Sequence, residues 1–162
     1  SYHDLRGSTL SPEEPFVSSD GGARGSKRAA HITGRTARTF PTWAGVELNL
    51  VEPLAAQDLS AYESVCFMAR GRGEARFKVP DVNTDPHGGV CEACYNSFGA
   101  DFGLSGEWQE LCFVLDELTQ QCCWGEPRRA LAKTHVFGFS WATHTVDTTY
   151  DLWIDDVRLS CR

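Results

Sequence analysis

Aromatic and polar side chains that could bind a ligand occur in segments that we expect to form loops. A sugar-binding surface needs rings that stack on the apolar face of a pyranose, and amides, carboxylates and guanidinium groups that hydrogen-bond its hydroxyls. Tyr95 and Trp124 are the preferred pair of rings because both have polar neighbours. The alternative for each ring is that it caps a hydrophobic core. The candidate ligand-binding residues are Tyr95, Trp124, Asn83, Asp81 and Trp43.

Asp155 is a candidate metal ligand near the end of the chain. Trp153, Asp155 and Val157 occupy alternate positions of the last apolar run, so they share one face if this run is a strand. If that face is the core, Trp153 is structural and Asp155 is a buried anion, which is costly unless a cation compensates it. Either a calcium ion binds there, or a β-bulge leaves Asp155 and Asp156 in solvent. Asp4 is a further candidate ligand.

Seven cysteines beside one methionine indicate an oxidising compartment. Cys91 and Cys94 form a C-x-x-C motif with His87 four residues upstream of it. A redox pair would need a thioredoxin-like βαβ context, which the sequence lacks, and a zinc site would need Cys122 or Cys123 as a further ligand. We expect the third alternative, a structural Cys91–Cys94 disulfide that tightens the loop.

The number of cysteines is odd, so at least one is unpaired or pairs between chains. Adjacent Cys122 and Cys123 could form a vicinal disulfide. We favour separate partners for them, because neighbouring side chains in an extended strand point to opposite faces.

No pattern in the sequence points to catalysis. It contains no nucleophile elbow, no metal-ligand pair on a helix and no phosphate loop. The 22 acidic residues identify no glycosidase, because such acids are recognised by their separation in space. We therefore expect a protein that is not an enzyme.

The charge disfavours nucleic acid as a partner. The formal net charge is -7, and the basic cluster between Arg24 and Arg38 is interrupted by Gly and Ser, which favours a solvated loop or edge. There is no apolar run of about 18 residues, so we expect no membrane insertion. Ser1 opens directly into polar sequence, and we interpret the chain as a mature or excised fragment.

Short runs of alternating apolar residues must position these side chains. Val46, Leu48 and Leu50 predict a half-buried strand, and the runs 65–69 and 75–79 around Gly71-Arg72-Gly73 predict a hairpin. A long loop, 80–99, follows them and is the first place to look for a site.

Later runs continue the β pattern. We expect a strand and a turn over 111–118, and a core strand over 137–141 that buries Trp141. Residues 1–41 are rich in turn residues, with short strands at best near 16–17 and 29–32. The sequence therefore predicts one all-β domain over 1–162, an antiparallel β-sandwich (jelly roll), on which the loop-rich segment 1–41 packs.

Three segments resemble secreted bacterial carbohydrate-binding-module-like domains with a galactose-binding-like jelly roll. They are 58–70, the stretch from Gly88 to Trp108, and 150–157, and Gln120 to Gly125 looks like that family's Gln followed shortly by Trp-Gly. The resemblance covers about residues 45–160. It implies a structural calcium at Asp155, a polysaccharide or oligosaccharide partner, and an extracellular, cell-surface or periplasmic location.

These observations favour a non-catalytic carbohydrate-binding module of a secreted or cell-surface protein. The alternative is a cell-surface adhesion or assembly module that binds another protein, motivated by the odd thiol and the basic cluster.

Overall fold

The alternating runs form ten β-strands in the computed structural model, which describes residues 1–4, 7–12 and 17–161. Two short 3₁₀ helices, η1 (Pro86–Gly88) and η2 (Leu115–Glu117), interrupt the connecting segments. The strands are β1 (Tyr2–His3), β2 (Thr9–Ser11), β3 (Ser19–Asp20), β4 (Arg28–Arg35), β5 (Ala44–Asn49), β6 (Tyr62–Val79), β7 (Phe98–Leu104), β8 (Gln109–Val114), β9 (Gly138–Thr143) and β10 (Thr149–Cys161).

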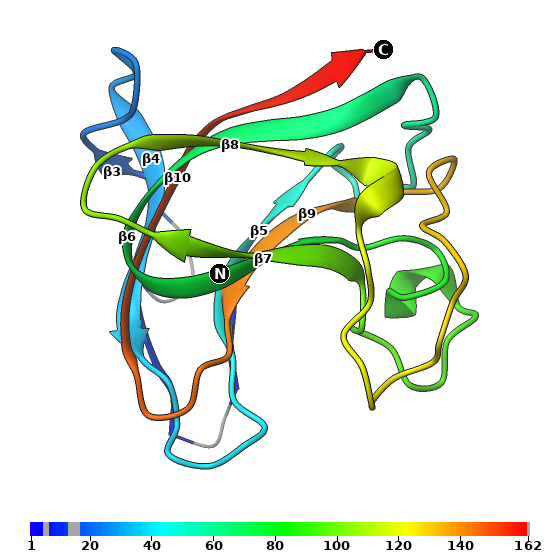
Figure 1. The fold of residues 1–162 in the computed structure, drawn as a ribbon, viewed down its shortest axis with the longest axis horizontal. Coiled ribbons are helices and arrows are strands. Elements are labelled where there is room, and N and C mark those ends of the chain that lie inside the picture. The colour runs from blue at the N-terminus through cyan, green and yellow to red at the C-terminus, as the bar shows by residue number, and fades with distance from the viewer. Residues whose placement is uncertain (5–6, 13–16, 162) are drawn as a thin grey trace.

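The strands form two antiparallel layers that share β6 (Figure 1). Sheet A has the order β1-β5-β9-β6-β7 and uses the second half of β6. Sheet B has the order β2-β4-β10-β6-β8 and uses the first half of β6, and β3 pairs with β4. The expected antiparallel β-sandwich is therefore confirmed.

Strand β6 is a single long strand, so the hairpin predicted from runs 65–69 and 75–79 is wrong. The chain passes through Gly71 at φ 142° and Gly73 at φ 100° and bends from sheet B into sheet A without reversing. A Cβ on Gly71 would lie 1.7 Å from the carbonyl oxygen of Asp151, so close approach of β10 requires glycine there. The glycines thus form a bend and not a turn.

The core lies between the two sheets. Phe67 of the sheet B half of β6 packs edge-on against Trp141 of β9, with 5.3 Å between ring centroids, and Phe77 of the sheet A half lies at the same distance from Phe67. Trp141 is almost fully buried, as expected of a residue that continues the phase of Phe137 and Phe139. These aromatic contacts join the two layers into one core.

Strand β10 buries the opposite phase from the one we expected. Its core-facing side chains in the first half are Tyr150, Leu152 and Ile154, so Trp153 and Asp155 point outward. A bulge between Asp155 and Arg158, with Asp156 at φ 48°, then shifts the register. The phase of the strand therefore keeps Trp153 and Asp155 out of the core, and the bulge changes the register only after Asp155.

The N-terminal segment contributes more strand than predicted. Its longest strand, β4, extends the expected run near 29–32 to eight residues and pairs with β10. Val17 is outside any strand, and Phe16 lies outside the described residues.

Two other expectations for the elements are confirmed. Strand β8 ends in the turn η2, and residues 80–97 form a long loop that contains η1. Across the described part of the chain, no helix is long and apolar enough to cross a membrane.

Two disulfides are present. The expected Cys91–Cys94 bond closes the loop, and Cys66–Cys112 joins β6 to β8. Cys122 and Cys123 are both free and exposed, so the prediction that each reaches a different partner is wrong. They lie in an exposed segment and not in a paired strand, so opposite-face geometry does not apply to them.

Candidate functional site

The outer face of sheet A carries a row of polar side chains across its strands. The register aligns Tyr2 of β1 with Gly45, Gly45 with Ala142, Ala142 with Arg76 and Arg76 with Asp101 of β7. The middle of the row is made of small residues, while an aromatic ring and an ion pair stand at its two ends. The Tyr2 ring covers Gly45, where a Cβ would lie 2.9 Å from the Tyr2 hydroxyl, and Ala142 is 1% exposed, so the middle of the row is buried.

A second row runs beside the first. It aligns Glu47 of β5 with Ser140, and Ser140 with Lys78 of β6. The hydroxyls of Ser140 and Tyr2 are hydrogen-bonded at 2.6 Å, and Lys78 Nζ lies 5.9 Å from the centre of the Tyr2 ring. The two rows together place hydroxyl, ammonium and carboxylate groups around one tyrosine ring.

Arg76 is a buried cation in this face. It is 4% exposed, its Nη1 lies 3.1 Å from Asp101 Oδ2, and its Nη2 donates to the carbonyls of Gly99, at 3.0 Å, and Thr119. Burying a guanidinium group is tolerated because the carboxylate and carbonyls replace its water. Arg76 therefore fixes β7, the segment at Thr119 and the carboxylate of Asp101 relative to one another.

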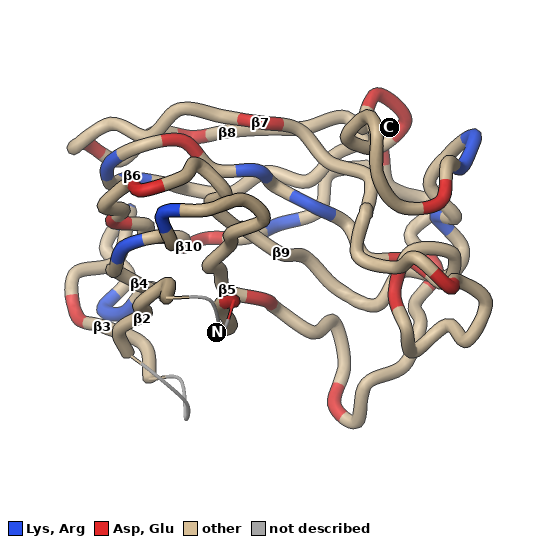
Figure 2. Tube along the Cα trace, turned by 90° about the horizontal axis from the view of Figure 1, so that it is seen from below, with Lys and Arg blue, Asp and Glu red and all other residues tan. Residues whose placement is uncertain are grey.

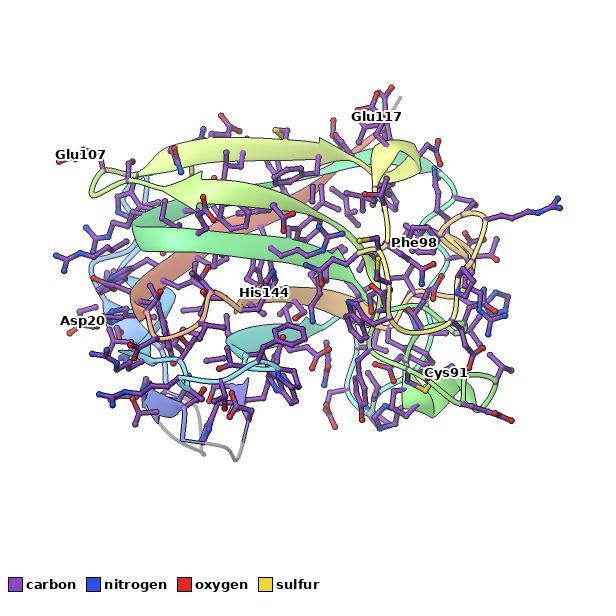
Figure 3. All side chains as sticks on the ribbon, turned by 60° about the horizontal axis from the view of Figure 1, so that its bottom comes forward. Asp20, Cys91, Phe98, Glu107, Glu117 and His144 are labelled. Atoms are coloured by element: carbon purple, nitrogen blue, oxygen red, sulfur yellow. A yellow bond between two sulfur atoms is a disulfide. The ribbon has the colours of Figure 1, made fainter. Side chains whose placement is uncertain are left out.

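A cavity of about 370 Å³ lies beside Asp101 and is lined by His144 and Gln121, among others. Burial is the main cause that lowers the pKa of His144, Lys78 and Arg76 lower it further, and Asp101 opposes them. The amide of Gln121 lies 3.2 Å from His144 Nε2, and because an amide nitrogen only donates, this Nε2 accepts. Figure 3 looks onto this face, with His144 near its middle.

The loops that hold Tyr95 and Trp124 border this face at the end where Cys91 is labelled in Figure 3. Asn96 Nδ2 donates to the carbonyls of Gln121, at 2.8 Å, and Trp124, at 2.7 Å. The side chains of Tyr95 and Trp124 are 64% and 44% exposed. The structure therefore brings the predicted pair of rings onto two joined loops and leaves both accessible.

Asp81 holds this loop together and does not face a ligand. It is fully buried, and its carboxylate accepts hydrogen bonds from Thr84 Oγ1 at 2.7 Å, from the N–H of Asn83 at 3.2 Å and from the N–H of Ala132 at 2.7 Å. Its assignment to the binding surface is therefore corrected. The side chain of Asn83 is partly exposed.

Trp43 lies directly before β5 and is 39% exposed. It is two residues before Gly45, in the alternation that puts Gly45 and Glu47 on the outer face of sheet A. Its N–H donates to Asp4 Oδ2 at 2.9 Å, and the same oxygen accepts from Ser8 and Thr42. Asp4 is buried in this cluster.

Asp155 lies in a different cluster from Asp4, at the turn 20–27. Asp155 Oδ2 accepts the N–H of Ala23 at 2.8 Å, and Oδ1 accepts that of Asp156 at 2.8 Å. The site of a Gly22 Cβ would lie 2.6 Å from Asp155 Oδ2 and 2.7 Å from Ser26 Oγ, so both oxygens face one narrow space. The turn 20–27 is thus closed around this carboxylate.

The expected sites omitted most of the residues on the outer face of sheet A. Arg76 and Lys78 could have been predicted, because they alternate with the apolar residues of the run 75–79 and therefore point outward. Tyr2 and His144 carry no such pattern, since only the pairing of distant strands places them.

Comparison with known proteins identifies the class of this fold. No family model and no curated protein matches the sequence. A family 11 carbohydrate-binding module of a cellulosomal cellulase of Clostridium thermocellum is similar in structure, with a TM-score of 0.74 and 11% identity over 99% of this chain and 86% of that chain.

Two further structures support this class. A family 30 module of another cellulosomal cellulase of Clostridium thermocellum has a TM-score of 0.65 at 12% identity, over 91% of this chain and 82% of that one. An exo-β-agarase has a TM-score of 0.61 at 14% identity, over 91% of this chain and 22% of its own. The chain is a carbohydrate-binding-module-like jelly-roll domain.

Proposed function

We propose that the chain is a non-catalytic carbohydrate-binding module that binds an oligosaccharide across the outer face of sheet A. The observation that carries the proposal is the cavity of about 370 Å³ beside Asp101, here called the sheet A groove, with the Tyr2 ring further along the same face. A pyranose stacks on an aromatic face and receives hydrogen bonds from charged groups beside it. A cavity of this volume can hold a sugar ring.

The first ligand to test is a β-1,3-1,4-mixed-linked tetrasaccharide. The family 11 module has been solved in complex with this sugar, in a structure that matches 98% of the present chain at a TM-score of 0.66 and 12% identity. Its hydroxyls are neutral, so they suit a face on which basic and acidic groups alternate. We expect binding that isothermal titration calorimetry detects.

Two substitutions of one residue separate the roles of the Tyr2 ring and hydroxyl. Tyr2→Ala removes the stacking surface and should weaken binding at least about tenfold, since an aromatic contact contributes about 1 kcal/mol beyond its buried area. Tyr2→Phe keeps the ring and removes the hydrogen bond to Ser140, so it should weaken binding less. Equal affinity of wild type and Tyr2→Ala, or no binding across a broad polysaccharide panel, contradicts the proposal.

The joined loops extend this surface in our proposal. Tyr95 and Trp124 would stack on sugar residues beyond the sheet A groove, with Asn83 beside them and Trp43 at the start of β5. Trp124→Ala should then weaken binding of a long polysaccharide more than binding of the tetrasaccharide, as measured by affinity electrophoresis and calorimetry.

The proposal has two further parts, the location of the protein and a bound calcium ion. The two disulfides support an extracellular, cell-surface or periplasmic protein. Calcium would be held by Asp155 together with hydroxyl and carbonyl oxygens of the turn 20–27, which supply the hard oxygen ligands that this ion prefers.

A cell-surface adhesion or assembly module is the second candidate function. The exposed thiols of Cys122, Cys123 and Cys161 favour it, because each could pair with a cysteine of another protein. The basic residues are weaker support, since Arg24, Arg28, Arg35 and Arg38 all form ion pairs within the chain. Specific capture of one protein, together with indifference to sugars, would favour this function.

A further inference from the structure

A ladder of planar side chains crosses the outer face of sheet B, away from the proposed sugar groove. Trp153 of β10 pairs in register with His31 of β4 on one side and with Arg70 of β6 on the other. The His31 and Trp153 rings are stacked, with centroids 3.6 Å apart and planes 13° from parallel. The Arg70 guanidinium lies 4.2 Å from the centre of Trp153 and 4.8 Å from that of Trp108.

This ladder forms one wall of a groove. An open cavity of about 590 Å³ lies where β6 passes from sheet B to sheet A, and its wall includes Trp153, Arg70, Arg72 and Asp151. Leu104, Ser105 and Gly106 also line it. A Cβ on Gly106 would meet nothing within 4 Å, so this residue faces open space.

Two arginines in the groove have no acidic partner among the described residues. No described carboxylate forms a salt bridge with Arg70 or Arg72. Within the described residues, the side chain of Arg70 donates a single long hydrogen bond of 3.4 Å, from Nη2 to the carbonyl of Gly21. The nearby carboxylate of Asp151 lies 2.9 Å from His31 Nε2 instead.

Lys and Arg residues alternate with Asp and Glu residues at the end of the molecule where β4, β6 and β10 are labelled in Figure 2. Arg24 there is paired with Glu110 and Asp156, whereas Arg70 and Arg72 have no such partner among the described residues. Unpaired guanidinium groups in an open groove attract an anion, and their planar fork matches a carboxylate with two parallel hydrogen bonds.

We propose that this groove is a second saccharide site that binds an acidic sugar residue, with Arg70 and Arg72 on its carboxylate. The class of ligand rests on the proposed function, whereas the site does not overlap with the sheet A groove. The rings of Trp153 and Trp108 hold Arg70 in place, which reduces the side-chain entropy lost on binding. Arg72 is exposed and reaches the same cavity.

Titration with trigalacturonate tests the site in two independent ways. Arg72→Gln removes one guanidinium group and should weaken binding at least about tenfold, the usual effect of losing a hydrogen bond between charged groups. Gly106→Leu fills the open space without removing a charge and should have a similar effect. Raising the salt concentration should also weaken binding, because solvent-exposed charges are screened.

The control variant is Arg129→Gln, which removes an arginine from the segment after η2 and should bind trigalacturonate as the wild type does. Neutral galactotriose should not bind in this groove. The inference is overturned if the wild type does not bind trigalacturonate, or if Arg72→Gln and Gly106→Leu both bind it as tightly as the wild type does. It is also overturned if galactotriose binds as tightly as trigalacturonate. Inorganic sulfate that binds as tightly as trigalacturonate would also overturn it, since only the anion would then be recognised.

Different variants test the proposed function and the second saccharide site. Loss of tetrasaccharide binding in Tyr2→Ala tests the sheet A groove, and loss of trigalacturonate binding in Arg72→Gln tests the sheet B groove. Arg72→Gln should leave the affinity for the tetrasaccharide unchanged.

Discussion

Charged residues on the outer face of sheet A are held by one another before any ligand arrives. Arg76 is buried against Asp101 and two carbonyls. A ligand hydroxyl that meets such a fixed group costs little further side-chain entropy. If the proposed function is correct, this preorganisation would favour binding of a sugar, whose own hydroxyls make only weak individual hydrogen bonds.

His144 should make the stability of the protein depend on pH. Its pKa is lowered from an ordinary value of 6.5, mainly by burial, so the folded protein binds fewer protons there than the unfolded chain does. The contribution of His144 to the free energy of unfolding is therefore full above pH 6.5 and falls as the pH drops below it. We expect His144→Gln to show a smaller loss of melting temperature between pH 7 and pH 5 than the wild type.

The matched control is His135→Gln, at an exposed histidine. It should keep the wild-type dependence on pH. A His144→Gln protein whose melting temperature falls as steeply as that of the wild type would show that the imidazole is not desolvated.

The sequence predicted the exposed rings well and the polar residues of sheet A poorly. Tyr95 and Trp124 follow from loop composition, which depends only on neighbouring residues. Tyr2, Arg76 and Asp101 lie in one row only because β1, β5, β9, β6 and β7 pair in one register. Alternation shows which residues share a face but not which strands are neighbours. Asp81 was misjudged because a buried loop carboxylate and an exposed one look alike in sequence.

At the scale of elements, β6 determines how the two sheets are joined. The sequence correctly marked both apolar runs of β6 and the irregularity at Gly71 and Gly73. It could not separate a bend from a turn, because both need glycine at positive φ. The deciding contact is the backbone of β10 at Asp151, which lies 80 residues after Gly71 in the sequence.

Gly71 and Gly73 should differ sharply when replaced by alanine. Gly71→Ala places a Cβ 1.7 Å from the Asp151 carbonyl oxygen, so we expect a loss of more than about 3 kcal/mol in the free energy of unfolding. Gly73→Ala meets no atom within 4 Å, and only its φ of 100° opposes it, which costs about 1–2 kcal/mol. Urea denaturation measures both. Equal losses would show that β10 can move away from the bend.

The turn 20–27 is the element that the proposed calcium would stabilise. If Asp155 binds the ion, a chelator should lower the melting temperature of the wild type and leave that of Asp155→Asn unchanged, since only the folded state binds the metal. Asp155→Asn itself should be less stable, because an amide replaces the carboxylate that accepts the N–H of Ala23.

The same chelator experiment can contradict a calcium ion at this turn. A wild-type melting temperature that does not respond to chelator would mean that the N–H groups of Ala23 and Asp156 alone hold Asp155. The calcium proposal would then be abandoned.

Across the whole molecule, one core separates the two proposed binding faces. The groove of sheet A and the groove beside Trp153 are on the outer sides of opposite layers, and β6 contributes Arg76 to the first and Arg70 and Arg72 to the second. A module of this kind could bind neutral and acidic chains at once. The strand that links the sheets would then also link the two sites.

The two disulfides should contribute unequally to the stability of this sandwich. Cys66–Cys112 closes a separation of 46 residues and joins β6 to β8, whereas Cys91–Cys94 closes a separation of 3 within one loop. In the chain-entropy model the cost of losing the crosslink rises with loop length, to about 4 kcal/mol for the first bond and about 1.6 kcal/mol for the second. Guanidinium denaturation of Cys66→Ala/Cys112→Ala and Cys91→Ala/Cys94→Ala measures both. The first variant should unfold at the lower denaturant concentration. If the second variant unfolds first, the disulfide within the loop stabilises the protein more than the disulfide between β6 and β8 does.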